Sequence, residues 1–476
     1  MIRCPFPVST MRIAIMLVLA SASMLEGSAA AQTAQNTTTS YQYDAAGNLT
    51  QIIDPLGHVT RQSYDALNRL SKVTDPNNGV LQYAYDGLGQ LASVTDPRGL
   101  TTAYQNDGLG NLKQLQSPDT GTTANTYDEA GNLLTTTDAK GQVTKYQYDV
   151  LSRVTRITYA DGSHVDYTYD QGVNALGRLT QVADASGTIQ YAYDKGGRLL
   201  TETRTMGGIA YVTSYAYDSA GRLASMTYPS GRSVTYARDS VGRISQITTA
   251  RDNITQTIVS QVHYRPFGPV QSFVLGNGQG VDRSYDLDGR MTGYTLNSQL
   301  QALTYDVASR ITAVSDAGNS ANNAGYGYDA LDRLTSHLRA DISRSYGYDA
   351  AGNRTSQSNG SAATTYSYAA NSNRLTQVSG SQTAVIDTDA NGSIVNSGAN
   401  QFVYDARGRL VSAVTALGVV QYRINGLGQR VQKITPSDTT LYQYDKRGKL
   451  IGESMPQGGL QKEYLYLDAI PVAVFQ

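Results

Sequence analysis

Few side chains in this sequence have the types and spacing that a chemical site requires. The four histidines, His58, His164, His263 and His337, are scattered through 476 residues, without the paired spacing of metal ligands. His58 and His164 each follow the glycine of a predicted tight turn, which favours a structural position in a strand. No nucleophile, base and orienting group can be assembled from such spacing, so we expect no catalytic residues and no enzyme.

One short motif resembles a calcium loop. Asp387, Asp389, Asn391 and Gly392 form a D-x-D-x-N-G pattern, like the first half of an EF-hand loop in which alternate oxygens surround Ca²⁺. The twelfth position holds Gly398, where a bidentate Glu is needed. The same residues fall where a tight turn of the repeat described below is expected, and we favour the turn. A weak calcium site at Asp387, Asp389 and Asn391 is the alternative, and no other cofactor is expected.

The composition indicates an all-β protein. There are 35 Tyr, 5 Phe and no Trp, and tyrosine favours strands. The formal net charge is -1 and Lys and Arg form no basic run, so a nucleic-acid partner is not predicted.

The N-terminus differs from the rest of the chain. Arg3 and Arg12 precede an apolar run, and Ala29–Ala31 supply a small-residue cleavage site before Gln32. The run is too short for a stable membrane span. We therefore predict a signal peptide over residues 1–31, a polar linker over 32–40, and secretion to the bacterial periplasm, cell surface or extracellular space. Cleavage would remove Cys4, the only cysteine, which excludes disulfides from the mature chain.

From Tyr41 onward the chain repeats. A period in this range marks a repeat architecture, here with about twenty units that form one domain over residues 41–476. Most neighbouring Tyr-Asp pairs are about 20 to 24 residues apart, and they begin at Tyr43, Tyr64, Tyr85, Tyr127, Tyr148, Tyr169, Tyr193, Tyr217, Tyr285, Tyr305, Tyr328, Tyr348, Tyr404 and Tyr444.

Each unit predicts a β-hairpin. After Tyr43, Asp44 and Gly47 have the spacing of a tight turn, because Asp bonds the following backbone N–H groups and Gly accepts a positive φ. A second turn begins at Asp54, and the hairpins join into an antiparallel meander. We expect the same structural roles, with no catalytic part, for Tyr85, Asp86, Tyr217, Asp218, Gly221, Tyr348, Asp349, Gly352, Tyr404, Asp405, Gly408, Tyr444, Asp445 and Gly448.

Two spacings describe the strands. Tyrosines at alternate positions, such as Tyr83 and Tyr85, predict a ladder of stacked rings on one face. Leu70 and Val73 recur in other units at i, i+3, which in a regular strand points them to opposite faces. Either both faces are partly covered or a bulge follows the turn.

The repeat unit resembles that of the Rhs and YD-repeat family. It is written YDSAGRL from Tyr217, YDARGRL from Tyr404 and YDKRGKL from Tyr444, and the resemblance runs from about Tyr41 to the C-terminus. It implies a long antiparallel β-sheet spiralling into a hollow, teneurin-like YD-shell, as in Rhs proteins, teneurins and insecticidal toxin-complex C components. In the polymorphic toxins of the family, the shell encloses a C-terminal effector.

The family also suggests what this chain does. The segment from Tyr464 to Phe475 looks like the strand that precedes the closing region of Rhs cores, and neither the closing motif nor a toxin follows it. We expect a secreted non-enzymatic scaffold, an Rhs core fragment or orphan used in toxin encapsulation and delivery or in cell-surface interaction. Its partner would be a downstream-encoded effector. The alternative is an adhesin-like module that binds a cell-surface carbohydrate, and open sheet edges would allow oligomers.

Overall fold

The computed structural model describes residues 38–476 except residue 297. The predicted signal peptide and most of the predicted linker lie outside the described residues. The first strand begins at Ser40.

The described chain is built from short β-strands and a single 3-10 turn. The strands before that turn are β1 (Ser40–Tyr43), β2 (Leu49–Ile53), β3 (Val59–Tyr64), β4 (Leu70–Thr74), β5 (Val80–Tyr85), β6 (Leu91–Thr95), β7 (Thr101–Asn106), β8 (Leu112–Ser117), β9 (Gly121–Tyr127), β10 (Leu133–Thr137), β11 (Val143–Tyr148), β12 (Val154–Thr158), β13 (His164–Tyr169), β14 (Leu179–Asp184), β15 (Gly187–Tyr193), β16 (Leu199–Met206), β17 (Ile209–Tyr217), β18 (Leu223–Thr227), β19 (Ser233–Arg238), β20 (Ile244–Arg251), β21 (Ile254–Tyr264), β22 (Val270–Leu275), β23 (Gly280–Tyr285), β24 (Met291–Leu296), β25 (Gln299–Tyr305) and β26 (Ile311–Asp316).

The 3-10 turn η1 (Ser320–Asn322) separates these from the remaining strands. They are β27 (Ala324–Tyr328), β28 (Leu334–Arg339), β29 (Ile342–Tyr348), β30 (Arg354–Asn359), β31 (Ala362–Tyr368), β32 (Leu375–Gly380), β33 (Ala384–Thr388), β34 (Ile394–Ser397), β35 (Asn400–Tyr404), β36 (Leu410–Thr415), β37 (Gly418–Ile424), β38 (Arg430–Ile434), β39 (Thr439–Tyr444), β40 (Leu450–Ser454), β41 (Leu460–Leu467) and β42 (Ile470–Phe475).

The strands form one antiparallel meander, so the predicted all-β fold is confirmed. Each strand pairs with the strand that follows it in the chain, from β1 with β2 to β41 with β42. Residues 251–283 and 379–400, which contain no Tyr-Asp pair, continue the same meander. In the described chain β1 and β42 each have one paired neighbour and one free edge.

The turns follow from the Asp and Gly positions. In the turn after Tyr85, one carboxylate oxygen of Asp86 accepts hydrogen bonds from the backbone N–H groups of Leu88, at 2.9 Å, and Gln90, at 2.8 Å. Gly89 adopts φ 81°, a left-handed conformation that glycine reaches without steric cost. We call the turn after a Tyr-Asp pair the YD turn and the turn at the other end of the hairpin the return turn.

A β-bulge follows the YD turn, which settles the question left open by the i, i+3 spacing. Tyr64 lies opposite Leu70 and Gln62 lies opposite Val73, so Ser71 is an extra residue in its strand. The bulge places Leu70 and Val73 on the face that carries Tyr64. The same register shift recurs after most YD turns, including those of β5 with β6 and β35 with β36.

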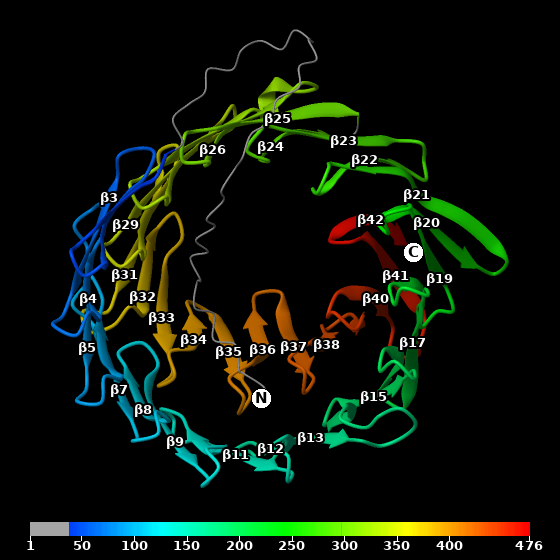
Figure 1. Ribbon diagram of the computed structural model, residues 1–476, viewed down its shortest axis with the longest axis horizontal. Helices are drawn as coiled ribbons and strands as arrows, with labels where there is room; N and C mark the ends of the chain where they lie inside the picture. Colours follow the sequence, from blue (N-terminus) through cyan, green and yellow to red (C-terminus); the bar gives the residue numbers. More distant parts are fainter. Residues whose placement is uncertain (1–37, 297) are drawn as a thin grey trace.

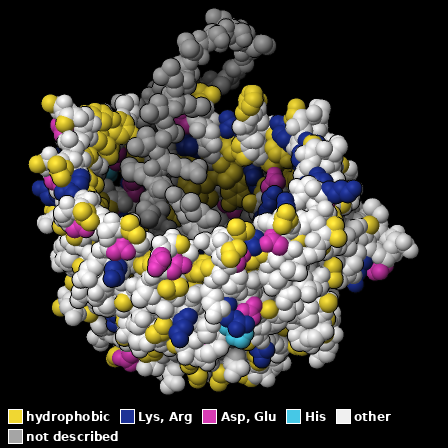
Figure 2. Space-filling model, turned by 60° about the horizontal axis from the view of Figure 1, so that its bottom comes forward, with side chains coloured by type: hydrophobic (Ala, Val, Ile, Leu, Met, Phe, Trp, Pro, Cys, Tyr) yellow, Lys and Arg dark blue, Asp and Glu magenta, His cyan; other side chains and the backbone are white. Residues whose placement is uncertain are grey.

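The meander winds into a spiral around a hollow centre (Figure 1). We call β1–β26 the first circuit and β27–β42 the second circuit, which runs beside the first. Hydrogen bonds between the circuits join residues 225 to 277 positions apart, and that separation measures one circuit of the chain. The space-filling view looks into the hollow and shows hydrophobic side chains on its visible wall (Figure 2).

The largest hydrophobic core lies where the end of the second circuit packs against the first. Ile451, Leu465 and Leu467 of β40 and β41 are fully buried against a cluster from β17–β22 that includes Ile247 and Val259. Burying apolar surface between two sheet layers is the main favourable contribution to such packing. Strands β40–β42 therefore lie on the inner side of β17–β21, as Figure 1 shows at the red end of the chain.

Candidate functional site

The tyrosines of the Tyr-Asp pairs link successive hairpins. The Tyr85 hydroxyl donates a hydrogen bond to the carbonyl of Leu70, which begins the strand after the preceding YD turn, at 2.9 Å. Where tyrosine is replaced, Asn106 and Arg238 donate to the equivalent carbonyls of Leu91 and Leu223. The same bond is made by Tyr64, Tyr127, Tyr148, Tyr169, Tyr193, Tyr217, Tyr264, Tyr285, Tyr305, Tyr328, Tyr348, Tyr368, Tyr404, Tyr444 and Tyr466.

Guanidinium groups, not other tyrosine rings, cover many of these tyrosines. Arg153, four residues after Asp149, donates from Nε to the Asp149 carboxylate at 2.6 Å, and its guanidinium lies 4.3 Å from the centre of the Tyr169 ring. Such cation–π contacts recur at Tyr85, Tyr217, Tyr264, Tyr328 and Tyr348. The prediction of rings stacked on one another is thus wrong; within the described residues, the ring stack is between Tyr326 and His337.

The residues expected to be structural occupy the repeat positions described above. Tyr43 belongs to the first described unit, its hydroxyl has no hydrogen-bond partner among the described residues, and the residue is 61% exposed. Asp44, Asp86, Asp218, Asp349, Asp405 and Asp445 each accept backbone hydrogen bonds within their YD turns. The turn glycines Gly47, Gly221, Gly352, Gly408 and Gly448 all have positive φ. The recurring Arg at the fourth position after Asp was a visible signal for the ion pairs, which the sequence reasoning missed.

The histidines lie apart, each with its own neighbour. His58 Nδ1 lies 2.9 Å from the Asp54 carboxylate in its return turn. His337 stacks on Tyr326, while His164 begins β13 and His263 lies opposite Ser272. Within residues 38–476, no group of three or more His, Cys, Asp or Glu side chains could hold a metal ion.

The D-x-D-x-N-G motif forms a YD-type turn that joins the two circuits. Asp389 accepts the N–H of Ser393 at 2.9 Å and pairs with Lys140 of the first circuit at 3.2 Å. The Asn391 amide donates to Asp138 at 2.7 Å, while Asp387 accepts from Asn396. These contacts engage the Asp387 and Asp389 carboxylates and the Asn391 amide nitrogen, while the Asn391 amide oxygen is buried without a hydrogen-bond partner among the described residues. The calcium alternative stays a prediction.

A polar seam runs along this junction, where return turns of the first circuit meet YD turns of the second. Asp119 accepts from the backbone and side chain of Asn373, and Arg98 donates to the Ser372 carbonyl at 2.8 Å. Sequence reasoning could not find the seam, because its partners are about one circuit apart.

Buried charges join the two circuits near the C-terminus. Arg232, in the return turn between β18 and β19, donates from Nε to Glu463 of β41 at 2.6 Å, and Ser230 donates to the same carboxylate. The Tyr228 hydroxyl donates to the Tyr464 carbonyl at 2.9 Å.

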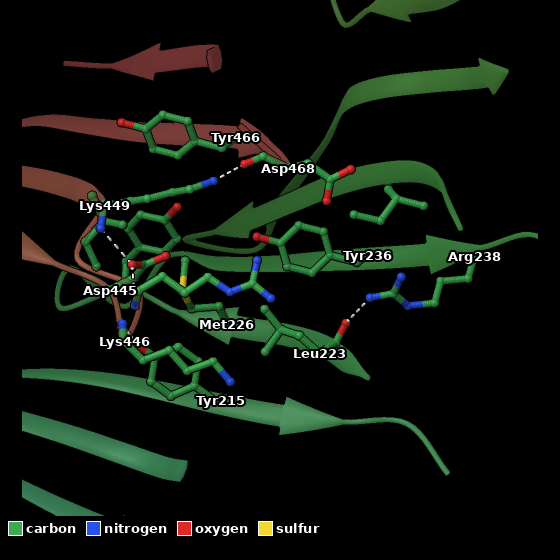
Figure 3. A pocket seen from close by; sticks show the side chains of 14 residues that line it. Tyr215, Leu223, Met226, Tyr236, Arg238, Asp445, Lys446, Lys449, Tyr466 and Asp468 are labelled. Carbon is green, nitrogen blue, oxygen red and sulfur yellow. Dashed lines mark hydrogen bonds between the residues drawn. The ribbon is translucent and has the colours of Figure 1, made fainter. Parts of the chain in front are cut away.

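A pocket opens beside these contacts (Figure 3). It has a volume of about 90 Å³ and lies between β17–β20 and the YD turn Asp445–Gly448 of the second circuit. Its walls include Tyr215, Tyr228 and Tyr236, and Figure 3 shows Asp445, Lys446 and Lys449 beside it.

The turn at the pocket is fixed to both circuits. The Lys446 N–H donates to the Tyr215 hydroxyl at 2.9 Å, and Lys446 Nζ donates to the Tyr217 hydroxyl at 2.7 Å. Lys449 Nζ donates to the Asp468 carbonyl. Burial raises the pKa of Tyr236 to about 12 and also raises the pKa of Tyr215 and Tyr228, so all three phenols stay protonated at neutral pH.

Two family models match the chain. The Teneurin YD-shell model matches residues 107–264 and 338–471, more than half of the chain, and the RHS Repeat model matches residues 30–59, 43–80 and 85–122. No curated protein matches the chain. Among the described residues, no helix is long and apolar enough to cross a membrane.

Solved structures share the fold. The Photorhabdus luminescens Tc holotoxin pore gives a TM-score of 0.70 at 16% identity, covering 92% of this chain and 30% of that chain. A TcdB2-TccC3 crystal structure gives 0.70 at 16% identity, with 92% and 31% coverage. This chain thus spans less than a third of the length of these chains, and the likeness concerns the fold alone.

Proposed function

Because the chain belongs to the teneurin YD-shell family, we propose that it is a scaffold whose hollow receives a polypeptide cargo, a toxin-like effector encoded downstream. One observation carries the proposal. The last strand, β42, lies on the inner side of β20 and β21, so a polypeptide joined after Gln476 would start inside the ring (Figure 1).

The bonding of the repeat supports a structural shell. The tyrosine hydroxyls and turn carboxylates are used by the chain itself, hairpin by hairpin, and so hold the wall that surrounds the hollow. The same bonding leaves few of these groups for a sugar, and the carbohydrate-binding alternative stays a prediction without a geometric feature that favours it. Secretion also stays a prediction, because residues 1–37 lie outside the described residues.

Protection of a tail from a protease tests the proposal. A disordered tail with a site for a sequence-specific protease is fused after Gln476. In a matched variant, the same site is inserted in the β20–β21 turn at Asp252 and Asn253, where the Asp252 side chain is 82% exposed. We expect the turn site to be cut much faster than the tail site. Equal cutting rates in the folded protein would rule out enclosure.

A further inference from the structure

The pocket beside the seam presents hydrogen-bond donors that the described chain does not use. The Tyr236 hydroxyl lines the pocket and has no hydrogen-bond partner among residues 38–476. The exposed Arg447 guanidinium also has no hydrogen-bond partner among these residues. Only the backbone N–H of Arg447 is bonded, to the Asp445 carboxylate. Arg238 Nε is buried without a hydrogen-bond partner, 3.9 Å from the Asp218 carboxylate. The half-buried Tyr236 hydroxyl and the buried Arg238 Nε therefore favour a ligand that supplies an acceptor, whereas the exposed Arg447 guanidinium is solvated until a ligand binds.

The charges around the pocket are unequal. Arg238, Lys446, Arg447 and Lys449 line it, against the carboxylates of Asp445 and Asp468, and Arg238 also pairs with Asp218 at 3.9 Å behind the wall, which leaves one positive charge in excess. This excess of positive charge in a partly enclosed space favours an anion.

The YD turn here departs from the usual unit. In a typical unit, Arg153 Nε donates a hydrogen bond to the second carboxylate oxygen of Asp149. The equivalent residue after Asp445 is Lys449, and its Nζ donates to the Asp468 carbonyl instead. The basic side chains of this turn are therefore directed to the seam and the pocket rather than to their own Asp.

The remaining walls are apolar. Leu223, Met226, Ile244 and Ile451 line the pocket together with the tyrosine rings. A volume of about 90 Å³ holds several waters or an organic group that displaces them. An inorganic ion would leave these apolar walls unused, whereas an anion with an apolar body would contact them.

We propose that this pocket binds a small organic anion, a carboxylate joined to an apolar or aromatic body. The carboxylate accepts from Arg447 and the Tyr236 hydroxyl, and the body packs against Leu223 and Met226. Two sources share this chemistry: a free carboxylic acid, and the C-terminal carboxylate of a peptide that ends in an apolar residue. Either would bridge the two circuits, because Tyr236 and Arg447 come from different circuits.

Titration calorimetry with the full chain tests the proposal. The probes are phenylacetate, with neutral benzyl alcohol as its control, and N-acetylphenylalanine, with its amide as control. We expect binding of at least one carboxylate and none of either neutral control. Arg447→Gln should weaken binding roughly tenfold or more, as expected for a lost hydrogen bond to a charged group. Arg61→Gln, the same change at an exposed position on β3, should leave affinity unchanged.

Further outcomes complete the test. Binding of N-acetylphenylalanine but not phenylacetate would identify the ligand as the C-terminus of a peptide. Equal or tighter binding of phenylacetate would identify it as a free carboxylic acid. Tyr236→Phe, which keeps the ring, should weaken binding by roughly two- to tenfold. The proposal is overturned if neither carboxylate binds the folded wild-type protein, if a neutral control binds as tightly, or if Arg447→Gln and Tyr236→Phe both bind like wild type.

Discussion

Arg232 and Glu463 lie 231 residues apart in the chain, yet Arg232 Nε is 2.6 Å from a carboxylate oxygen of Glu463. Both are buried, with exposures of 9% and 1%. The pair joins the return turn after β18 to β41 and closes the second circuit onto the first. A buried ion pair adds little over an apolar substitute, but removing one partner leaves an unpaired buried charge.

Glu463→Gln should therefore destabilise the protein by about 3 kcal/mol or more, since Arg232 loses its counter-ion. Urea unfolding measures the change in the free energy of unfolding. Glu129→Gln removes an exposed carboxylate of a YD turn and should change the free energy of unfolding by less than about 0.5 kcal/mol. Equal effects of the two substitutions would contradict the assigned role of Glu463.

Tyr85→Phe should cost about 1 kcal/mol, because it removes the hydroxyl that bonds the Leu70 carbonyl while keeping the ring. Tyr43→Phe is the matched control. Tyr43 occupies the same repeat position in the first described unit, where its hydroxyl has no carbonyl partner among the described residues, and the substitution there should have no measurable effect. The stabilities of the two variants are compared by thermal or urea unfolding. A loss of stability in Tyr43→Phe as large as that in Tyr85→Phe would count against the proposed hydrogen bond.

Gly392→Ala should destabilise the protein more than Gly408→Ala. Both glycines have positive φ, 83° and 72°, so both substitutions carry the left-handed penalty of about 1–2 kcal/mol. A Cβ at Gly392 would also overlap the Asp119 carbonyl oxygen across the seam, whereas Gly408 has open space. Overpacking adds about 1–3 kcal/mol at residue 392. Identical melting temperatures for the two variants would contradict the seam contact.

Stability should fall in acid. Hydrogen bonds from Arg69, Arg153 and Arg222, their backbone N–H groups first, lower the pKa of Asp65, Asp149 and Asp218 below the usual 3.8. A carboxylate with a lowered folded-state pKa contributes stability above its unfolded pKa and loses it as pH falls through the folded pKa.

Burial raises the pKa of Glu202, which acts in the opposite direction but is a single group. The melting temperature should be nearly constant from about pH 5 to 7 and fall steeply below about pH 4. A melting temperature that holds steady down to about pH 2 would show that these turn bonds do not stabilise the folded state.

Local features were predictable from the sequence and long-range ones were not. The Asp and Gly spacing of Asp86 and Gly89 predicts the YD turn, and alternating tyrosines predict the strands between turns. The bulge at Ser71 was one of two open alternatives, because the i, i+3 spacing alone does not distinguish them.

The seam and the pocket depend on curvature. Lys140 meets Asp389, and Lys446 meets Tyr217, only because the sheet returns after one circuit. The small twists between successive strands add up over many strands and bring the sheet back beside itself. No local sequence pattern encodes which residues then meet. The Asp387–Gly392 motif illustrates the difference: its turn was predicted, while its seam contacts were not.

The most direct test of the closed spiral is the cross-link between Lys140 and Asp389. Their Nζ and Oδ2 atoms lie 3.2 Å apart although the residues are separated by 249 positions. A zero-length carbodiimide cross-linker applied to the native protein, followed by isolation of the monomer and peptide mass spectrometry, should give the Lys140–Asp389 peptide pair. Absence of that pair in a folded monomer, with cross-links confined to neighbouring hairpins, would show an open sheet and contradict the shell.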